Sequence, residues 1–320
     1  MRRAIRRNFI KLCNRIQDSS MPPPTQEEQL NIEEMRKRFE ALPLITSPEG
    51  TPGSEAEWND NMNRLRELVL SENPREFLRW EVIRYTMFSN DDPYLHAELK
   101  YLKSHSLWKS LWKEVIPEET TGHPIPYYRY PNSSGNLIHH TYHTAQFQDQ
   151  TDIELKKLDL VLEFGGGYGS FCRVIHKLGF HGKYIIFDLP HFSELQRYFL
   201  RSIGISTITV DEFHSADNGV CCVSDFQQLA TLLSSIPEHA EKLFTATWSL
   251  SETPVHIREK ILPLVTKFDA FLIAYQHRFN EMDNSDFFTQ WRTLKMQGLI
   301  WKDLLIPQIP DSSYLFGRRL

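Results

Sequence analysis

Residues 162–169, LEFGGGYG, carry three consecutive glycines and a fourth after one aromatic residue. The apolar residues 160–162 before them predict a buried strand, and SFCRVIHKLGF (170–180) after them has the apolar spacing of a helix. The glycines therefore lie in a strand-to-helix turn. In a doubly wound sheet, such turns stand at the carboxyl ends of the strands, where ligands bind. Because glycine lets a ligand lie against bare backbone, the stretch predicts a binding loop.

The spacing of the glycines narrows the kind of ligand. A dinucleotide fingerprint, G-x-G-x-x-G, that begins at Gly165 would end where this chain has Ser170. Gly165, Gly167 and Gly169 instead form G-x-G-x-G, and Glu163 precedes the first of them by two residues. This pattern disfavours a nicotinamide dehydrogenase and leaves open a merely tight turn.

Two acids follow at comparable places of later strands. Asp188 lies near the end of KYIIFDLP, where a carboxylate can accept hydrogen bonds from both hydroxyls of a ribose. It could also cap a helix close to Pro190. Asp225, in VSDFQQL, follows a candidate strand and is equally suited to capping the helix that begins with Phe226.

From residue 158 onward, apolar runs alternate with helical segments. The runs are LDLVLEFG, KYIIFDLP, either ITV or GVCCV, KLFTATWSL and FDAFLIAY. This alternation predicts an α/β fold with a mostly parallel sheet and helices on both faces, and SYLFGRRL (313–320) is expected to form an antiparallel edge strand. The region before the sheet reads as mainly helical. We expect a basic amphipathic helix (1–20), a helical N-terminal region covering an acceptor site (21–150) and a ligand-binding sheet domain (151–320).

The glycine pattern resembles the first motif of the Rossmann-like class I S-adenosylmethionine-dependent methyltransferases. The segments VLEFGGGYG, FDLPHFSELQRYFL and TATWSLSETP together resemble the bacterial sugar O-methyltransferase family over roughly residues 120–280. The resemblance implies S-adenosyl-L-methionine as cofactor. It also implies that Glu163 orients the amino-acid part of the cofactor and that the glycine loop packs against the same end. Asp225 would meet the adenine amino group, and Phe226 would pack on the adenine ring.

Transfer of a methyl group to a hydroxyl needs alignment and removal of a proton from oxygen. The candidate bases are Glu252 in WSLSE, His277 in AYQHRF and His143 in IHHTYH. Each of these residues could instead have a structural role. Glu252, for example, could be an acidic residue in the first turn of a helix, where it interacts favourably with the helix dipole. His139 and His143 would share a helical face, but no carboxylate lies close in sequence to complete a metal site, so no metal is predicted.

The composition and net charge of the chain limit the kinds of partner that we expect. The chain has 320 residues, a net charge of −5 and four cysteines whose spacing fits neither a disulfide framework nor a zinc site. We expect a cytoplasmic enzyme with a sugar or other hydroxyl-bearing small-molecule acceptor and no nucleic acid, because duplex binders usually carry a basic excess. Residues 1–18, basic with apolar residues at helical spacing, predict either peripheral membrane contact or a solvated helix docked on the protein.

Two alternatives remain open at this point. A small-molecule or phenol O-methyltransferase shares the FDLPH segment, but such enzymes usually carry a histidine where this chain has Trp248 and Ser249. A non-catalytic nucleoside-binding scaffold of the same fold would bind the cofactor without turnover.

Overall fold

The computed structural model describes residues 8–9, 11–13, 15–16, 21–48, 50–51, 53–89 and 92–320. The basic amphipathic helix expected over residues 1–20 lies mostly outside these residues. Within the described residues, no helix is both long and apolar enough to cross a bilayer.

A seven-stranded sheet forms the centre of the molecule, with strand order β10-β11-β7-β6-β3-β4-β5. The five strands β3 to β7 run parallel to their neighbours in this set. Their bounds are Leu160–Phe164 (β3), Lys183–Phe187 (β4), Gly219–Val223 (β5), Lys242–Thr247 (β6) and Ala270–Gln276 (β7). The Rossmann-like α/β class expected from the sequence is confirmed, and GVCCV, rather than ITV, supplies the strand β5.

The antiparallel end of the sheet differs in one detail from the expectation. The C-terminal strand β11 (Ser312–Arg319) pairs antiparallel with β7, but it also pairs with β10 (Leu299–Leu305), which forms the outer edge. The sequence of β10, LIWKDLL, places mostly exposed or half-buried side chains along its length. Because an edge strand need not be apolar on both faces, the residue pattern of β10 did not predict a strand.

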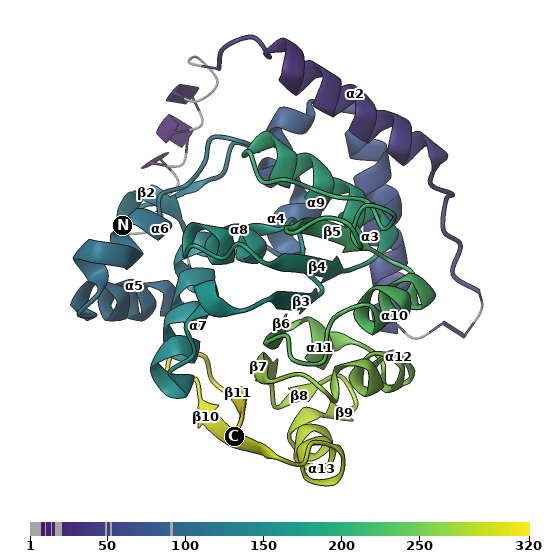
Figure 1. Ribbon diagram of the computed structural model, residues 1–320. Coiled ribbons are helices and arrows are strands. Elements are labelled where there is room, and N and C mark those ends of the chain that lie inside the picture. The colour runs from purple at the N-terminus through teal and green to yellow at the C-terminus, as the bar shows by residue number, and fades with distance from the viewer. Residues whose placement is uncertain are drawn as a thin grey trace.

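Strand residues alternate between two hydrophobic cores. Val161, Tyr184 and Ile186 face one core, whereas Leu162, Ile185 and Phe187 face the other. Figure 1 shows helices on both faces of the sheet. They are α7 (Gly135–Thr151), α8 (Ser170–Lys177) and α9 (Pro190–Ser202) against the first core, and α10 (Phe226–Ser234), α12 (Val255–Ile261) and α13 (Asn284–Lys295) against the second. Burial on both faces explains why these strands read as continuous apolar runs.

The chain before the sheet is mainly helical, as expected. Its elements are α2 (Gln26–Ala41), α3 (Gly53–Ser71), η1 (Pro74–Arg79), α4 (Glu81–Thr86), α5 (Tyr94–Ser104), η2 (Trp108–Trp112), α6 (Lys113–Val115) and the short pair β1 (Pro126–Tyr127) and β2 (Tyr130–Ser134). The helix α2 packs along α9, so this region shares the first core with the sheet. The remaining short elements are η3 (Leu155–Lys157), α11 (Ser249–Glu252), η4 (Leu262–Val265), β8 (Arg278–Phe279) and β9 (Met282–Asp283).

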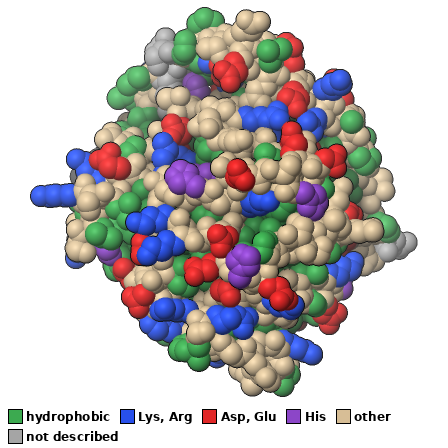
Figure 2. All heavy atoms as spheres, in the orientation of Figure 1, with side chains coloured by type: hydrophobic (Ala, Val, Ile, Leu, Met, Phe, Trp, Pro, Cys, Tyr) green, Lys and Arg blue, Asp and Glu red, His purple; other side chains and the backbone are tan. Residues whose placement is uncertain are grey.

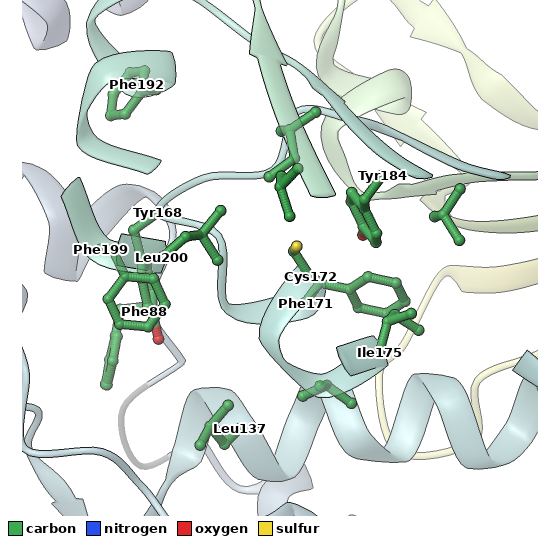
Figure 3. Close-up of a cluster of buried hydrophobic side chains, with 14 of the residues drawn as sticks. Phe88, Leu137, Tyr168, Phe171, Cys172, Ile175, Tyr184, Phe192, Phe199 and Leu200 are labelled. Atoms are coloured by element: carbon green, nitrogen blue, oxygen red, sulfur yellow. The ribbon is translucent and has the colours of Figure 1, made fainter. Parts of the chain in front are cut away.

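The helix after the glycine loop is held by aromatic and aliphatic packing. Phe171, Cys172 and Ile175 of α8 point into the first core, where Tyr184 of β4 approaches them from the sheet (Figure 3). Next to them, the ring of Phe88 from the N-terminal region stacks on Tyr168 of the loop at 6.2 Å between ring centroids. The N-terminal region therefore packs directly against the loop that the sequence identified.

Candidate functional site

A cavity of about 690 Å³ lies at the carboxyl ends of β3, β4 and β6. Its volume is in the range of small-molecule and cofactor sites. One wall comes from the sheet domain and includes residues 163–168, 187–190 and 247–249. The facing wall comes from residues 54–55, 58–59 and 85–89, together with Asp92, Tyr94 and the start of α7. A ligand in the cavity would therefore lie between the sheet domain and the N-terminal region.

The glycine loop forms the floor of this cavity. Gly165 has φ +72°, and a Cβ added there would stand 2.4 Å from Cβ of Ser249. Gly167 has φ +58°, and the atom nearest to an added Cβ would be Sδ of Met87, at 3.4 Å. Gly165 thus permits a close approach of two loops, whereas the missing side chain of Gly167 leaves space in the cavity. Gly169, also at positive φ, sits over Phe199 and Leu200 and is not part of the cavity wall.

Asp188 ties the loop to the next strand. Its Oδ2 accepts hydrogen bonds from the backbone N–H of Gly167 at 3.0 Å and from Nε2 of Gln196 at 2.8 Å. Its Oδ1 accepts from the N–H of Leu189 at 2.7 Å. Burial raises the pKa of this carboxyl to about 7. A carboxylate can accept about four hydrogen bonds, so acceptor capacity remains for a ligand hydroxyl at the cavity wall.

Gln196 is a site residue that the sequence reasoning missed. Its Nε2 also donates to the carbonyl of Gly167 at 2.9 Å, so one amide braces both the loop and Asp188. Its Oε1 is buried without a hydrogen-bond partner among the described residues. Its position could have indicated this role, because Gln196 lies in the helix that begins with the proline of FDLP, close in sequence to Asp188.

Glu163 lies beneath the loop and is almost fully buried. The hydroxyl of Tyr184 donates to its Oε2 at 2.7 Å. Burial raises the pKa of Glu163 to about 8, with the neighbouring Asp188 acting in the same direction. The carboxyl lines the cavity, so a cationic group brought there would favour its ionised form.

Asp225 and Phe226 follow β5 after one intervening residue, and they have different roles. Phe226 lines the cavity and packs on Phe187 with 4.6 Å between ring centroids. Asp225 is exposed, does not line the cavity and caps α10, because its Oδ1 accepts from the N–H of Gln228 at 2.8 Å. Of the two readings of Asp225, the structure therefore shows the helix cap, and the contact with adenine stays a prediction.

The three candidate bases are not brought together. Glu252 lines the cavity and its Oε1 accepts from Nε2 of Gln276 at 3.0 Å, while burial raises its pKa. His277 turns away from the cavity, and its Nε2 lies 2.8 Å from Oγ of Ser313. His143 is fully buried behind the wall, with Nδ1 at 2.5 Å from the hydroxyl of Tyr314.

A second missed feature is a row of polar side chains beside the cavity. Nδ1 of His139 lies 3.0 Å from both carboxylate oxygens of Glu98, and Nε2 of His139 accepts from Nε1 of Trp248 at 3.2 Å. His139 and Trp248 both line the cavity. The sequence could not supply Glu98, which lies 41 residues before its partner. In the described part of the chain, no group of three or more histidine, cysteine or acidic side chains could hold a metal ion.

The cavity has the features that S-adenosylmethionine requires. The bare backbone at Gly167 leaves a cradle that a Cβ would fill. Asp188 retains acceptor capacity for a hydroxyl, Phe187 and Phe226 offer apolar rings, and Glu163 offers a carboxyl for an ammonium group. The residues present therefore fit this group.

Comparison with known proteins gives structural neighbours only. No family model and no curated protein matches the sequence. Solved structures with a similar fold include an rRNA methylase from Streptococcus thermophilus (TM-score 0.38, 13% identity, 56% of this chain and 95% of that chain covered). Others are a precorrin-6y C5,15-methyltransferase from Geobacter metallireducens (0.36, 11%, 55% and 86%) and the fibrillarin pre-rRNA processing protein of Methanococcus jannaschii (0.34, 14%, 52% and 69%). Each is a protein that this chain resembles in fold.

These neighbours correct two expectations. None is named for a sugar, so the resemblance to the sugar O-methyltransferase family is not supported. Two are named for ribosomal RNA, contrary to the expected partner, a small hydroxyl compound with nucleic acid excluded, and the exclusion of nucleic acid is not carried further. The net charge is a sum over the whole chain and sets no limit on where basic side chains lie, and on the face in Figure 2 basic and acidic side chains are interspersed.

Proposed function

We propose that this protein is an S-adenosylmethionine-dependent methyltransferase. The observation that carries the proposal is the glycine loop, whose backbone is joined through Asp188 and Gln196 to the strand beside it and which leaves a cradle at Gly167. S-adenosylmethionine would supply a methyl group on a positively charged sulfur. The protein's contribution is to hold donor and acceptor in line in a site that excludes water.

The cavity divides into two parts that suit the two substrates. The donor part contains Glu163, Gly167, Asp188 and Phe226. The acceptor part is formed by the remaining wall, which includes Tyr94, Asn136, His139, Trp248, Glu252 and Gln276. Tyr94, His139 and Glu252 in the acceptor part carry groups that can exchange a proton, which supports a hydroxyl oxygen as the atom that receives the methyl group.

The division of the chain follows from the same arrangement. Residues 151–320 would bind the methyl donor, and residues 21–150 would cover the acceptor. The support for this is that residues 54–55, 58–59 and 85–89 face the glycine loop across the cavity. The identity of the acceptor is a matter for experiment, because the cavity walls combine apolar rings with single polar groups.

The experiment uses the full chain with S-adenosylmethionine that carries a labelled methyl group. A panel of monosaccharides, phenols and short RNA oligonucleotides serves as acceptors, and both labelled product and S-adenosylhomocysteine are measured. The proposal predicts binding of the donor and label transfer to one acceptor class. Donor binding without transfer to any acceptor would favour the non-catalytic scaffold, and absence of donor binding would refute the proposal.

A further inference from the structure

We propose that His139, oriented by the buried carboxylate of Glu98, is the base that removes the proton from the acceptor hydroxyl. The proposal rests on the proposed methyltransferase function and adds the group that handles the proton. Neither residue was among the candidate bases named from the sequence, because Glu98 and His139 come into contact only in the folded chain.

The first step is the orientation of the imidazole. Nδ1 of His139 faces both oxygens of Glu98 at 3.0 Å, and Nε2 of Gln308 donates to the same carboxyl at 3.1 Å. Glu98 is fully buried, and both of these side chains approach it with nitrogen atoms that can donate. A carboxylate in this position holds the proton on Nδ1 and leaves the lone pair on Nε2.

A second partner fixes the same tautomer independently. Nε1 of Trp248 lies 3.2 Å from Nε2 of His139, and an indole nitrogen can only donate. Nε2 must therefore be the accepting nitrogen. The indole N–H marks the direction from which a donor reaches Nε2, so an acceptor hydroxyl would reach this nitrogen when a side-chain rotation of Trp248 turns the indole aside while its backbone stays in place.

The third step is the position of the pair relative to the donor part of the cavity. Trp248 directly follows β6 and has φ +70°, a conformation that is uncommon for a side chain of this size. The next residue, Ser249, donates to the carbonyl of Phe164 and contacts Gly165. Trp248 is thus anchored to the glycine loop, and its hydrogen bond to His139 joins the two walls of the cavity at this point.

The other histidines of α7 lack this arrangement. Nδ1 of His140 lies 2.7 Å from Oγ of Ser170, and burial lowers the pKa of His140 to about 3. His143 faces the hydroxyl of Tyr314, and burial lowers its pKa well below the usual range. Among the three, His139 alone contacts a carboxylate, the arrangement that orients a catalytic imidazole in unrelated enzymes.

The bond changes and the path of the proton can be written with the acceptor, the methyl donor, His139 and water. The acceptor oxygen forms a bond to the methyl carbon, and the carbon–sulfur bond breaks with its electron pair staying on sulfur. The hydroxyl proton moves to Nε2 of His139. The resulting imidazolium is stabilised by Glu98 and later returns the proton to water.

The first test determines which ring nitrogen of His139 carries the proton, and it needs no ligand. In the full-length protein labelled with ¹⁵N-histidine, long-range ¹H–¹⁵N correlations distinguish a bare ring nitrogen from a protonated one, and the variant His139→Asn assigns the signals. We expect a bare Nε2 and a protonated Nδ1 at His139. A proton on Nε2 in the wild-type protein would overturn the proposal.

The second test separates the base from a structural role. Asn can keep the contact with Glu98 but has no basic nitrogen, so His139→Asn is expected to lower kcat about 100-fold or more while calorimetry shows unchanged binding of S-adenosylmethionine. Glu98→Gln should lower kcat as a positioning variant, and the double variant should be no slower than His139→Asn alone. His181→Asn, the same change at an exposed histidine outside the cavity, should retain turnover.

The outcomes distinguish the two proposals. If the wild-type protein does not bind S-adenosylmethionine, the proposed function fails, and the tautomer still tests the geometry of the pair. If His139→Asn turns over normally, or if Glu252→Gln abolishes turnover and His139→Asn does not, the methyltransferase stands and His139 is not its base.

Discussion

At the scale of single residues, the site contains two acids, Glu163 and Asp188, whose pKa values are raised by burial. Burial raises the pKa of Glu163 to about 8 and that of Asp188 to about 7, and the two carboxyls lie on either side of the glycine loop. Two buried carboxyls with raised pKa values in one cavity are typical of a binding site rather than of a structural ion pair. A bound cation would reverse this effect by favouring the ionised forms.

The raised pKa of Glu163 predicts a pH dependence of stability. Its folded-state pKa of about 8 exceeds the ordinary 4.5, so between these pH values the unfolded chain releases a proton that the folded protein keeps. The free energy of unfolding therefore falls as pH rises through this window, by up to about 1.4 kcal/mol per pH unit. Glu163→Gln lacks this loss.

We therefore expect the stability of Glu163→Gln relative to the wild-type protein to increase from pH 5 to pH 8, as measured by urea unfolding. Glu67→Gln, at an exposed position of α3, is the control and should show no such trend. A constant difference between Glu163→Gln and the wild-type protein over this range would contradict the burial that we assign to Glu163.

The close approach at Gly165 predicts a measurable steric effect. Gly165→Ala places a Cβ 2.4 Å from Cβ of Ser249 at φ +72°, whereas Gly204→Ala meets nothing within 4 Å at a similar φ of +77°. The control therefore carries only the backbone strain of about 1 kcal/mol. Thermal unfolding should show a clearly larger loss for Gly165→Ala, and equal losses would mean that the two loops do not touch.

At the scale of elements, the carboxyl ends of the parallel strands bring the site together. The chain leaves β3 into the glycine loop, β4 into Asp188 and β6 into Trp248 and Ser249. The hydrogen bond from Ser249 to the carbonyl of Phe164 joins the ends of β3 and β6 directly. Each strand thus contributes one part of the site, and α7 supplies His139 from across the cavity.

The cap of α10 gives a prediction that separates the two readings of Asp225. Asp225→Ala removes the acceptor for the N–H of Gln228 and should destabilise the protein by about 1 kcal/mol, whereas Asp225→Ser keeps a capping oxygen and most of the stability. Both variants should bind S-adenosylhomocysteine as the wild-type protein does in calorimetry. Loss of binding in both would show that the carboxylate meets the ligand.

At the scale of the whole molecule, the N-terminal region and the sheet domain share one core and enclose one cavity. Residues 54–55, 58–59 and 85–89 belong to the N-terminal region, yet they face the glycine loop. A ligand held there touches both parts and should stabilise the contact between them. We therefore expect ligand binding to slow hydrogen exchange in segments that lie far from the glycine loop in the sequence.

Hydrogen exchange measured by mass spectrometry tests this expectation. With S-adenosylhomocysteine bound, exchange should slow in the peptides that contain Trp58 and Met87 as well as in the glycine loop, because these segments form the cavity walls. The helix α13, which does not line the cavity, should be unaffected. Protection confined to the loop would mean that the N-terminal region does not cover the ligand.

The sequence predicted the parts of this molecule that follow a local pattern. The strands β3 to β7 are buried on both faces and the glycine loop has a distinctive spacing, so both could be recognised. The edge strand β10 is largely exposed and carries no such pattern. Glu98 and Gln308 could not be found, because Glu98 meets His139, and Gln308 meets Glu98, only through the packing of α5 and the β10–β11 connection against α7.

We have proposed that the glycine loop and Asp188 hold S-adenosylmethionine. Calorimetric titration of S-adenosylhomocysteine, with NAD in parallel, into the wild-type protein and Asp188→Ala tests it most directly. Gly204→Ala, outside the cavity, serves as the control. The account predicts that the sulfur nucleoside binds the wild-type protein and the control, that Asp188→Ala loses this binding and that NAD does not bind. Binding of NAD alone, or equal binding of S-adenosylhomocysteine to Asp188→Ala, would contradict it.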